Sequence, residues 1–438
     1  MKILYKLILP LLFFSYTSAQ HLWVEGMYNS DINFYQTQKA FNEYWENRTI
    51  EKGKGWKQFK RWESFMEPRV YPDGKFQNTL MSVYETEKIQ HRSSLQDIAS
   101  WEAVGPTNVP LTNWGNKRGV GRINDIAFHP NNPNTIWVGT PAGGLWKTTD
   151  GGQTWNSNTD QLPSIGIGDI EIDPNNTNIM YLASGDRDGG DTYAFGILKS
   201  IDGGESWNTT GLSFNYSYGY VGYQVKVNPD NSNIINASVK KAGSGEVYRS
   251  TDGGVSWETT LNGVKLISIE QHPTNPDILY GGTSSTGKVY KSTDNGQSWN
   301  IILPTQGLPS SGGYRVTLAV TPNNPSVVYA LISNTDGGYL GLYKSNDEGE
   351  NWNLQSDTPN LLTWSTNGSG NDGQGWYDLA LAISPYNENE VYVGGINTWR
   401  STDGGLSWNI ISHWYGSNGV SYKHADEHVL KFHPNGTL

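Results

Sequence analysis

The octapeptide TTDGGQTW at residues 148–155 decides the fold, because the sequence repeats it five more times. The copies read SIDGGESW (200–207), STDGGVSW (250–257), STDNGQSW (292–299), SNDEGENW (345–352) and STDGGLSW (401–408). Successive copies are 42 to 56 residues apart, measured between their aspartates, which are Asp150, Asp202, Asp252, Asp294, Asp347 and Asp403. A period of roughly 40–50 residues is typical of the four-stranded blades of a β-propeller.

The residue types of the octapeptide predict a structural turn. Its aspartate can accept hydrogen bonds from the amides of the turn, its glycines suit positive φ, and its Ser or Thr hydroxyl completes the local network. The tryptophan is expected to insert between neighbouring sheets, where a large flat ring fills the wedge. We therefore interpret the six aspartates as scaffold and not as reacting groups.

Each repeat also carries three further strand signals. In the first repeat, residues 123–128 alternate and end in a proline turn, residues 135–139 form a second strand, and residues 144–147 lead into the octapeptide. After the sixth octapeptide, residues 429–432 and the turn His433-Pro434-Asn435-Gly436 read as the start of another blade. We predict an all-β propeller of about seven blades over residues 101–438, with six complete blades and a truncated last one. Further C-terminal domains, or a second propeller, are expected in the full-length protein.

The N-terminal part of the chain differs from the repeats. Residues 1–20 read as a signal peptide, with Lys2 and Lys6 before an apolar run and Ser18-Ala19-Gln20 at its end. Residues 34–45 and 55–65 carry aromatics at helical spacing, and Pro68 and Pro72 follow them. We predict a small helical segment at 21–100, acting as a propeptide or a brace, in a secreted or cell-surface protein.

Composition excludes several classes of function. The 438 residues carry a formal net charge of −11 without a long block of either sign, which argues against nucleic-acid binding. The sequence has no cysteine, so it has neither disulfides nor a thiol nucleophile. No stretch after the leader is long and apolar enough to suggest a membrane span in the mature chain.

The repeated pattern S/T-x-D-x-G-x-x-W resembles the Asp box, or BNR repeat, of sialidases, sortilin-type ectodomains and xyloglucanase-like glycoside hydrolases. The resemblance covers residues 101–438 and implies a propeller with the boxes on the turns between third and fourth strands. The segment GWKQFKRWE (55–63), with the leader, looks like large exported proteins of Bacteroidetes that carry sortilin-like repeats. In those proteins a stretch similar to HADEH (424–428) begins a blade.

Neither enzyme class matches at its catalytic motifs. A sialidase would need an F/Y-R-I-P motif and an arginine triad, but Arg122 and Arg315 lack the following proline, and Arg249 and Arg400 lead into Asp boxes. The xyloglucanase-like segment T-D-V-G-G-A-Y carries a catalytic aspartate, and the matching segment TPAGGLW (140–146) has Pro141 there. We therefore favour a protein without the mechanism of that family.

The loops opposite the Asp boxes are the expected ligand-binding rim, since a rigid scaffold there positions variable loops. Aromatic residues are dense in them and suit stacking on sugar rings or gripping a peptide. The binding candidates are Tyr193, Tyr216, Tyr218, Trp364, Trp376, Tyr377, Trp414 and Tyr415. The catalytic candidates, if the protein is an enzyme, are the loop carboxylates Asp186, Asp188, Asp378 and Asp426. Packing of the aromatics against one another remains the alternative.

Two groups of residues suggest metal binding at first sight. Asp186, Asp188 and Asp191 resemble a calcium loop but lack the glycine and glutamate of an EF-hand, which favours solvated turn aspartates. His424, Asp426 and His428 alternate, so a strand would place them on one face, where they could hold a metal or form a hydrogen-bonded cluster. We favour the hydrogen-bonded cluster and expect no cofactor.

Together these patterns predict a secreted propeller that binds a polysaccharide or an extracellular protein through its loop rim. One alternative is a glycoside hydrolase that uses loop carboxylates. A second alternative is a structural spacer within a large adhesin. A carboxyl with a raised pKa, paired with a second carboxyl about 5–10 Å away across a cleft, would favour the hydrolase, and an aromatic platform without such a pair would favour binding.

Overall fold

The computed structural model describes residues 21–29, 32–50, 54–76, 121–214, 219–241, 243–416 and 419–438. The predicted signal peptide and residues 77–100 of the predicted N-terminal segment therefore lie outside the described residues. The chain divides into two compact units, residues 1–79 and 80–438. In the described part of the chain, no helix combines the length and the apolar character that a membrane crossing requires.

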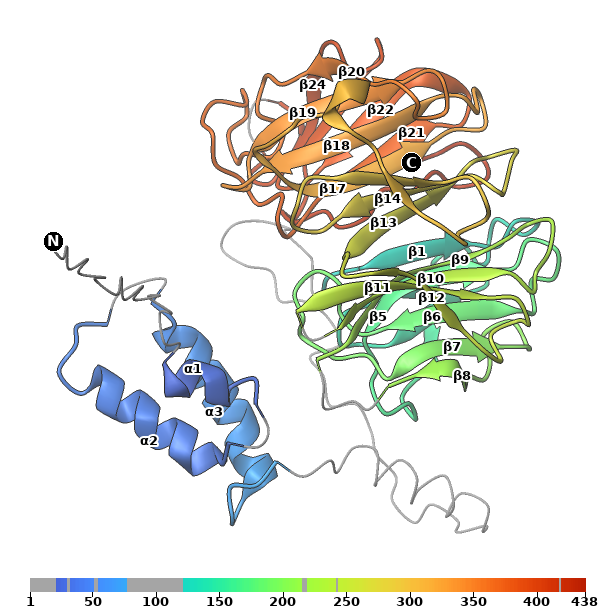
Figure 1. Cartoon of the computed structure of the whole chain (residues 1–438). Coiled ribbons are helices and arrows are strands. Elements are labelled where there is room, and N and C mark those ends of the chain that lie inside the picture. Colours follow the sequence, from blue (N-terminus) through green and yellow to red (C-terminus); the bar gives the residue numbers. More distant parts are fainter. Residues whose placement is uncertain are drawn as a thin grey trace, which may run out of the picture. The chain divides into compact units, whose positions relative to one another are not determined.

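The described residues of the first unit form three helices, α1 (Leu22–Gly26), α2 (Phe34–Trp45) and α3 (Trp56–Val70) (Figure 1). Trp23, Phe41 and Phe59 form its core, and the rings of Phe41 and Phe59 stack with centroids 3.7 Å apart. The helix predicted at 34–45 is confirmed. The helix predicted to end near residue 65 instead continues through Pro68 to Val70, which is buried. Proline so close to a helix end interrupts only the last turn, so this burial suffices to keep it helical.

The second unit is a β-propeller of six blades, each a four-stranded antiparallel meander (Figure 1). Blades 1 to 3 contain β1 (Asp125–Phe128), β2 (Ile136–Gly139), β3 (Leu145–Thr148), β4 (Asn156–Ser157), β5 (Ile167–Ile172), β6 (Met180–Ser184), β7 (Gly196–Ser200), β8 (Asn208–Ser213), β9 (Val221–Val227), β10 (Ile235–Lys241), β11 (Ser244–Ser250) and β12 (Glu258–Asn262). In blade 1, the first three strands begin and end within one or two residues of the bounds that the repeat pattern predicts.

Blades 4 to 6 follow the same order. They contain β13 (Leu266–Gln271), β14 (Leu279–Thr283), β15 (Val289–Ser292), β16 (Asn300–Ile301), β17 (Gly313–Val320), β18 (Val328–Asn334), β19 (Tyr339–Ser345), β20 (Asn353–Ser356), β21 (Ala380–Ser384), β22 (Asn387–Gly394), β23 (Thr398–Ser401) and β24 (Asn409–His413). A short 3-10 helix (Pro304–Gln306) follows β16, and a short strand β25 (Ser421–Tyr422) runs parallel to β24 at the edge of blade 6. The fold predicted from the six Asp boxes is therefore confirmed.

Each Asp box forms the turn between the third and fourth strands of its blade, and blade 2 shows how. The Ser200 hydroxyl donates to Asp202 Oδ1 (2.7 Å) and the Ser206 hydroxyl to Asp202 Oδ2 (2.6 Å). Backbone amides of residues 205 and 206 also donate to Asp202, and Gly203 and Gly204 have φ of 73° and 83°. The hydroxyl of Ser206 contributes most to lowering the pKa of Asp202 to about 2, so its charge belongs to the turn.

Five of the six box tryptophans fill the wedge between their own blade and the preceding one. Trp207 packs with Trp137 of blade 1, and its counterparts in blades 3 to 6 occupy the same position, namely Trp257, Trp299, Trp352 and Trp408. Trp155 of blade 1 differs, because it is 36% exposed against 8% for Trp207. The difference follows from position, since among the described residues the neighbour on this side of blade 1 is the 428–433 segment and not a four-stranded blade.

Residues 428–433 lie between blades 6 and 1. Lys431 Nζ is 2.7 Å from Asp125 Oδ1 of β1, the Phe432 ring packs edge-on against Tyr392 of β22, and His433 Nε2 contacts the Pro133 carbonyl (2.9 Å). This segment is where the inner strand of a seventh blade would run. The predicted strand at 429–432 is not formed in the structure, because no neighbouring strand pairs with it.

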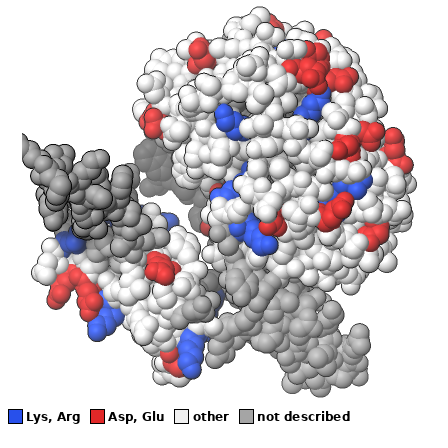
Figure 2. Space-filling view, in the orientation of Figure 1, with Lys and Arg blue, Asp and Glu red and all other residues white. Residues whose placement is uncertain are grey.

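The face of the propeller seen in Figure 2 is largely uncharged, with Lys and Arg or Asp and Glu in small separate groups. Some charged side chains of the propeller form pairs that join neighbouring blades, such as Lys147 with Glu205 (2.6 Å) and Lys291 with Glu350 (2.6 Å). Neither positive nor negative charge dominates this face.

Candidate functional site

Residues from distant parts of the chain meet at one end of the propeller axis, on the rim opposite the Asp boxes. Asp186 and Asp188 come from the loop between β6 and β7, and Tyr377 and Asp378 come from the connection that precedes β21. His428 comes from the segment between blades 6 and 1. Tyr377 and His428 pack edge to face with centroids 4.6 Å apart. The rim predicted from the repeat pattern is thus where most of the predicted carboxylates lie.

Asp186 and Asp188 are held in place by the protein itself. Asp186 accepts hydrogen bonds from the amides of residues 188, 189 and 191, and Arg122 is 2.5 Å away. Asp188 lies 2.7 Å from Arg315 and 2.9 Å from His428 Nδ1. Burial alone would raise the pKa of Asp188, but these cationic and hydrogen-bonding partners hold it well below its usual range. Both carboxylates are buried among these partners and therefore organise the loop.

Three arginines converge at this centre, which sequence patterns did not predict. Arg122 donates to the Tyr377 hydroxyl (2.6 Å), Arg187 to the His428 carbonyl (3.4 Å) and Arg315 to the Tyr377 carbonyl (2.7 Å). All three guanidinium groups are largely buried and already neutralised by Asp186, Asp188 or Asp169. They therefore do not form an open triad for the carboxylate of a sialic acid. Arg122 and Tyr377 are 255 residues apart, so no local motif could reveal the pairing.

Asp378 has the most unusual environment of the four carboxylate candidates. Its side chain is 1% exposed, and neither carboxyl oxygen has a hydrogen-bond partner. Burial first, and then the charge of Asp426, raise the pKa of Asp378 to about 8. Asp378 is therefore protonated at neutral pH, next to a second carboxyl that is only half-buried. The raised pKa of a carboxyl that is influenced by a second carboxyl is one part of the arrangement expected of the hydrolase alternative.

Asp426 lies in the stretch that covers Asp378. Its φ is +71°, a left-handed conformation that few non-glycine residues adopt. The neighbouring Lys423 donates to the Gly395 carbonyl (2.9 Å) and is 3.0 Å from Glu427, whose amide also bonds to Gly395. These contacts fix the 423–427 stretch over the loop between β22 and β23. Asp426 is thereby kept beside Asp378 but open to solvent.

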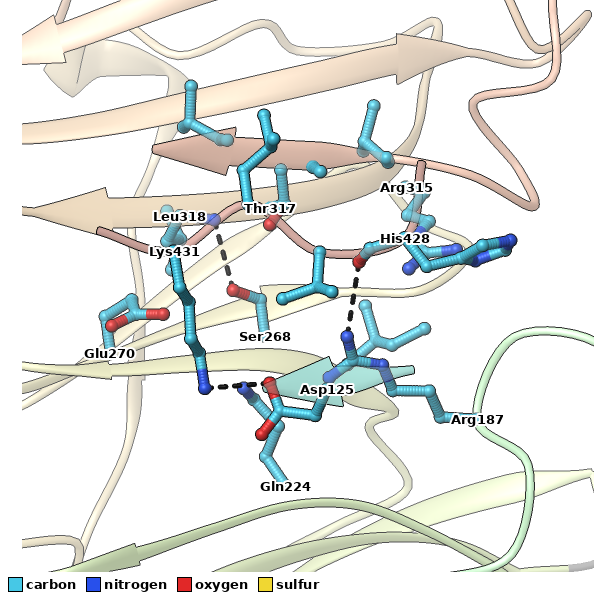
Figure 3. Close-up of a pocket in the computed structure, with 16 residues that line it drawn as sticks. Asp125, Arg187, Gln224, Ser268, Glu270, Arg315, Thr317, Leu318, His428 and Lys431 are labelled. Atoms are coloured by element: carbon cyan, nitrogen blue, oxygen red, sulfur yellow. Dashed lines mark hydrogen bonds and ion pairs between the residues drawn. The ribbon is translucent and has the colours of Figure 1, made fainter. Parts of the chain in front are cut away.

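The centre of the propeller is narrow and charged. The pocket in Figure 3 has a volume of about 70 Å³ and is lined by charged, polar and aliphatic side chains, with Lys431 reaching Asp125 across it. Burial raises the pKa of Glu171 to about 7, although Lys226 opposes the shift. A cavity of this volume has room for several waters.

The predicted aromatic residues divide into two groups on the loop rim. Trp376 is 54% exposed and packs beside Tyr377, which is half-buried at the axis. Trp364, Trp414 and Tyr415 form a second group, with 58%, 36% and 50% of their surfaces exposed. Tyr193 is half-buried in the loop between β6 and β7. Tyr216 and Tyr218 lie outside the described residues.

The two predicted metal groups are organised by other contacts. The His424 ring is exposed and faces the Ala425 carbonyl, while His428 is buried against Asp188, so the trio with Asp426 does not converge. The reason is that residues 424–428 are not extended as a strand, and alternation therefore does not place them on one face. The aspartates of the 186–191 loop, which resemble a calcium loop in the sequence, pair with arginine side chains. Across the described ranges no cluster of three His, Asp or Glu has metal-binding geometry.

The comparisons with known proteins agree with the Asp-box propeller. A family model described as Sortilin, neurotensin receptor 3 (Sortilin-Vps10) matches residues 245–380. A xyloglucanase of Acetivibrio thermocellus is 25% identical over 374 residues, covering 75% of this chain and 44% of the relative. A xyloglucanase of Hypocrea jecorina is 25% identical over 357 residues, covering 71% of this chain and 41% of the relative.

Solved structures support the same fold. A GH74 xyloglucanase from Xanthomonas campestris superimposes with a TM-score of 0.51 at 18% identity, covering 72% of this chain and 49% of the other. An ancestral GH74 enzyme gives a TM-score of 0.52 at 19% identity, covering 67% and 39%. The chain thus spans less than half the length of each of these relatives. It is a β-propeller of the sortilin-like and xyloglucanase-like type.

Proposed function

We propose that this protein is an exported glycoside hydrolase-like propeller that acts on a polysaccharide of the glucan type. The observation that carries the proposal is the buried Asp378, whose pKa near 8 keeps it protonated at neutral pH beside Asp426. The relatives named xyloglucanases support a glucan as the substrate class. This favours hydrolysis over the pure binding module that the sequence patterns suggested first.

The two carboxyls suit acid and base roles in glycoside hydrolysis. Protonated Asp378 would give its proton to the leaving glycosidic oxygen as the C–O bond breaks. Ionised Asp426 would take a proton from the water that attacks the sugar carbon, so that the proton count balances. A protonated and an ionised carboxyl in different environments are the pairing that this chemistry needs.

Access to Asp378 requires a local movement. Because its carboxyl is 1% exposed, a glycosidic oxygen would reach it only after the 423–427 stretch shifts away from Gly395. That stretch is held by the bonds of Lys423 and Glu427 to the Gly395 carbonyl, by the Lys423 amide on the His413 carbonyl, and by the Thr398 hydroxyl on the Glu427 carboxylate. Substrate binding would have to replace these contacts, and Trp376 next to Tyr377 offers a surface on which a sugar could stack.

The position of the acid pair departs from the catalytic position that the xyloglucanase-like family implies. Pro141 occupies that position, and its carbonyl accepts a hydrogen bond from Thr192 (2.6 Å). Pro141 cannot act as an acid, so this protein would hydrolyse by a different pair or not at all. The second candidate function is therefore glycan binding without cleavage, and Pro141 is the observation that favours it.

Reducing-sugar release from xyloglucan and mixed-linkage β-glucan tests the proposal. We expect the unaltered protein to release sugar, with activity falling as pH rises through about 8 because Asp378 loses its proton. Asp378→Asn and Asp426→Asn should each reduce release by about 10³-fold while near-UV circular dichroism stays unchanged. Retention on the same polysaccharides without any sugar release would instead support the binding module.

A further inference from the structure

We propose that Trp364, Trp414 and Tyr415 form a separate binding patch for a glycan chain, which rests on the proposed function and extends it. The patch belongs to two connections, one between β20 and β21 and one after β24. The first connection also ends at Asp378, so a chain bound on the patch would lie on the same rim as the acid pair.

The three rings are held together by their own backbone. The Trp414 indole donates to the Trp364 carbonyl (3.1 Å), and the rings of Trp414 and Tyr415 lie with centroids 5.5 Å apart at 61°. With 58%, 36% and 50% of their surfaces exposed, the rings are among the most exposed large aromatics of the propeller. A cluster of large exposed aromatic side chains lowers the solubility of a protein. Such clusters on native proteins are therefore typical of ligand-binding sites.

Two buried polar residues act as positioning residues beneath the patch. His413, 5% exposed, contacts the Trp364 carbonyl through Nε2 (3.2 Å) and accepts from the Tyr415 amide through Nδ1 (3.1 Å). A neutral ring with its proton on Nε2 satisfies both contacts. Asn397, fully buried, donates to the Thr363 carbonyl (3.0 Å) and accepts from the Trp414 amide (3.3 Å). The backbone that carries the three rings, and the Trp414 indole itself, are therefore held in place before any ligand arrives, which lowers the entropy cost of binding.

The composition around the patch points to a sugar ligand. Residues 365–375, which follow Trp364, read STNGSGNDGQG and contain no aliphatic side chain and a single charge. Hydroxyl and amide groups beside flat rings match the hydroxyls and the C–H faces of pyranose rings. Protein interfaces are instead enriched in Met and Arg beside their aromatics. The Asn360 amide fixes this loop by donating to the carbonyls of Gly370 (3.0 Å) and Asp372 (2.9 Å).

Affinity gel electrophoresis on xyloglucan and mixed-linkage β-glucan, beside a gel without polysaccharide, measures binding directly. We expect Trp364→Ala and the double variant Trp414→Ala/Tyr415→Ala to weaken retention about tenfold, since each aromatic stack contributes roughly a factor of two to ten. Tyr386→Ala is the matched control, because Tyr386 is 66% exposed but lies in the β21–β22 turn on the Asp-box rim. Its retention should not change.

The positioning role of His413 has its own readout. His413→Gln keeps a donor that can reach the Trp364 carbonyl, whereas His413→Ala removes it. At equal thermal stability, the Gln variant should retain more binding than the Ala variant. Equal loss in both, with unchanged folding, would contradict the positioning role.

The outcome for the patch is separable from the outcome for hydrolysis. Asp378→Asn should bind polysaccharide as well as the unaltered protein, and patch variants should still cleave short oligosaccharides if the acid pair is catalytic. The proposal is overturned if the unaltered protein is not retained on either polysaccharide, or if Trp364→Ala is retained as strongly as Tyr386→Ala.

Discussion

Asp202 in an Asp box and Asp378 on the loop rim carry the same side chain, but their surroundings shift its pKa in opposite directions. Asp202 is near the surface and accepts hydrogen bonds from two hydroxyls and two amides, which lower its pKa to about 2. The Asp378 carboxyl is buried and neither of its oxygens has a hydrogen-bond partner; burial, and then the charge of Asp426, raise its pKa to about 8. Donors stabilise the charge at one end of the blades, whereas burial retains the proton at the other. The first arrangement supports the turn, and only the second leaves a group free for chemistry.

The largest expected effect is that substitution of Asp378 lowers activity, whereas substitution of Asp202 lowers thermal stability. Asp378→Asn should reduce sugar release by about 10³-fold, within the range for loss of an acid or base group, because an amide cannot give up a proton. Asp202→Asn should leave the activity of the folded protein unchanged and lower its melting temperature, because it removes the charge that the box donors stabilise. Initial rates and thermal melts on both variants measure this. Equal rates for the two variants would contradict a catalytic role of Asp378 that Asp202 does not share.

The two rims also differ in what the sequence could reveal. An Asp box is complete within eight residues, so its donors, glycines and tryptophan appear together in every copy. The environment of Asp378 depends on Gly395 and on the stretch around Asp426, which are distant in sequence. Sequence patterns could therefore name Asp378 as a loop carboxylate, but could not show that it is buried and without partners.

The same limit explains the other differences between prediction and structure. Alternation of His424, Asp426 and His428 predicted one strand face, but a strand needs a partner and residues 423–432 have none in the structure. Pro68 predicted a helix end, but burial of Val70 keeps the last turn of α3 helical. In each case a contact with a distant residue, or its absence, decided the local structure.

The next expected effect compares two box tryptophans. Trp207→Ala should lower the free energy of unfolding by about 3–5 kcal/mol, because the ring is 8% exposed and fills the wedge between blades 1 and 2. Trp155→Ala should lower the free energy of unfolding by about 1 kcal/mol or less, because Trp155 is already 36% exposed in the folded protein. Urea denaturation followed by circular dichroism measures both. Equal costs would mean that the gap between blades 6 and 1 is filled in solution.

A smaller effect concerns the pH dependence of stability. Because the folded protein keeps Asp378 protonated up to about pH 8 and the unfolded chain ionises it near 4, stability should fall as pH rises through this window. Asp378→Asn removes the titration, so this variant should exceed the parent in melting temperature most at pH 8 to 9. The difference should vanish towards pH 4, where both states are protonated. A constant difference across this range would mean that Asp378 ionises normally.

The smallest effect concerns the charge pairs that join the box turns to the preceding blade. Lys147 lies 2.6 Å from Glu205, but the glutamate side chain is 63% exposed, so water screens the attraction. Glu205→Gln should change the free energy of unfolding by less than about 0.5 kcal/mol, and Glu350→Gln, which removes the similar pair with Lys291, should behave alike. A loss near that of Trp207→Ala would show that charge, and not the buried tryptophan, holds adjacent blades together. Because the pairs recur at the same position while the tryptophans carry the buried area, we expect the blades to separate only when the tryptophans are removed.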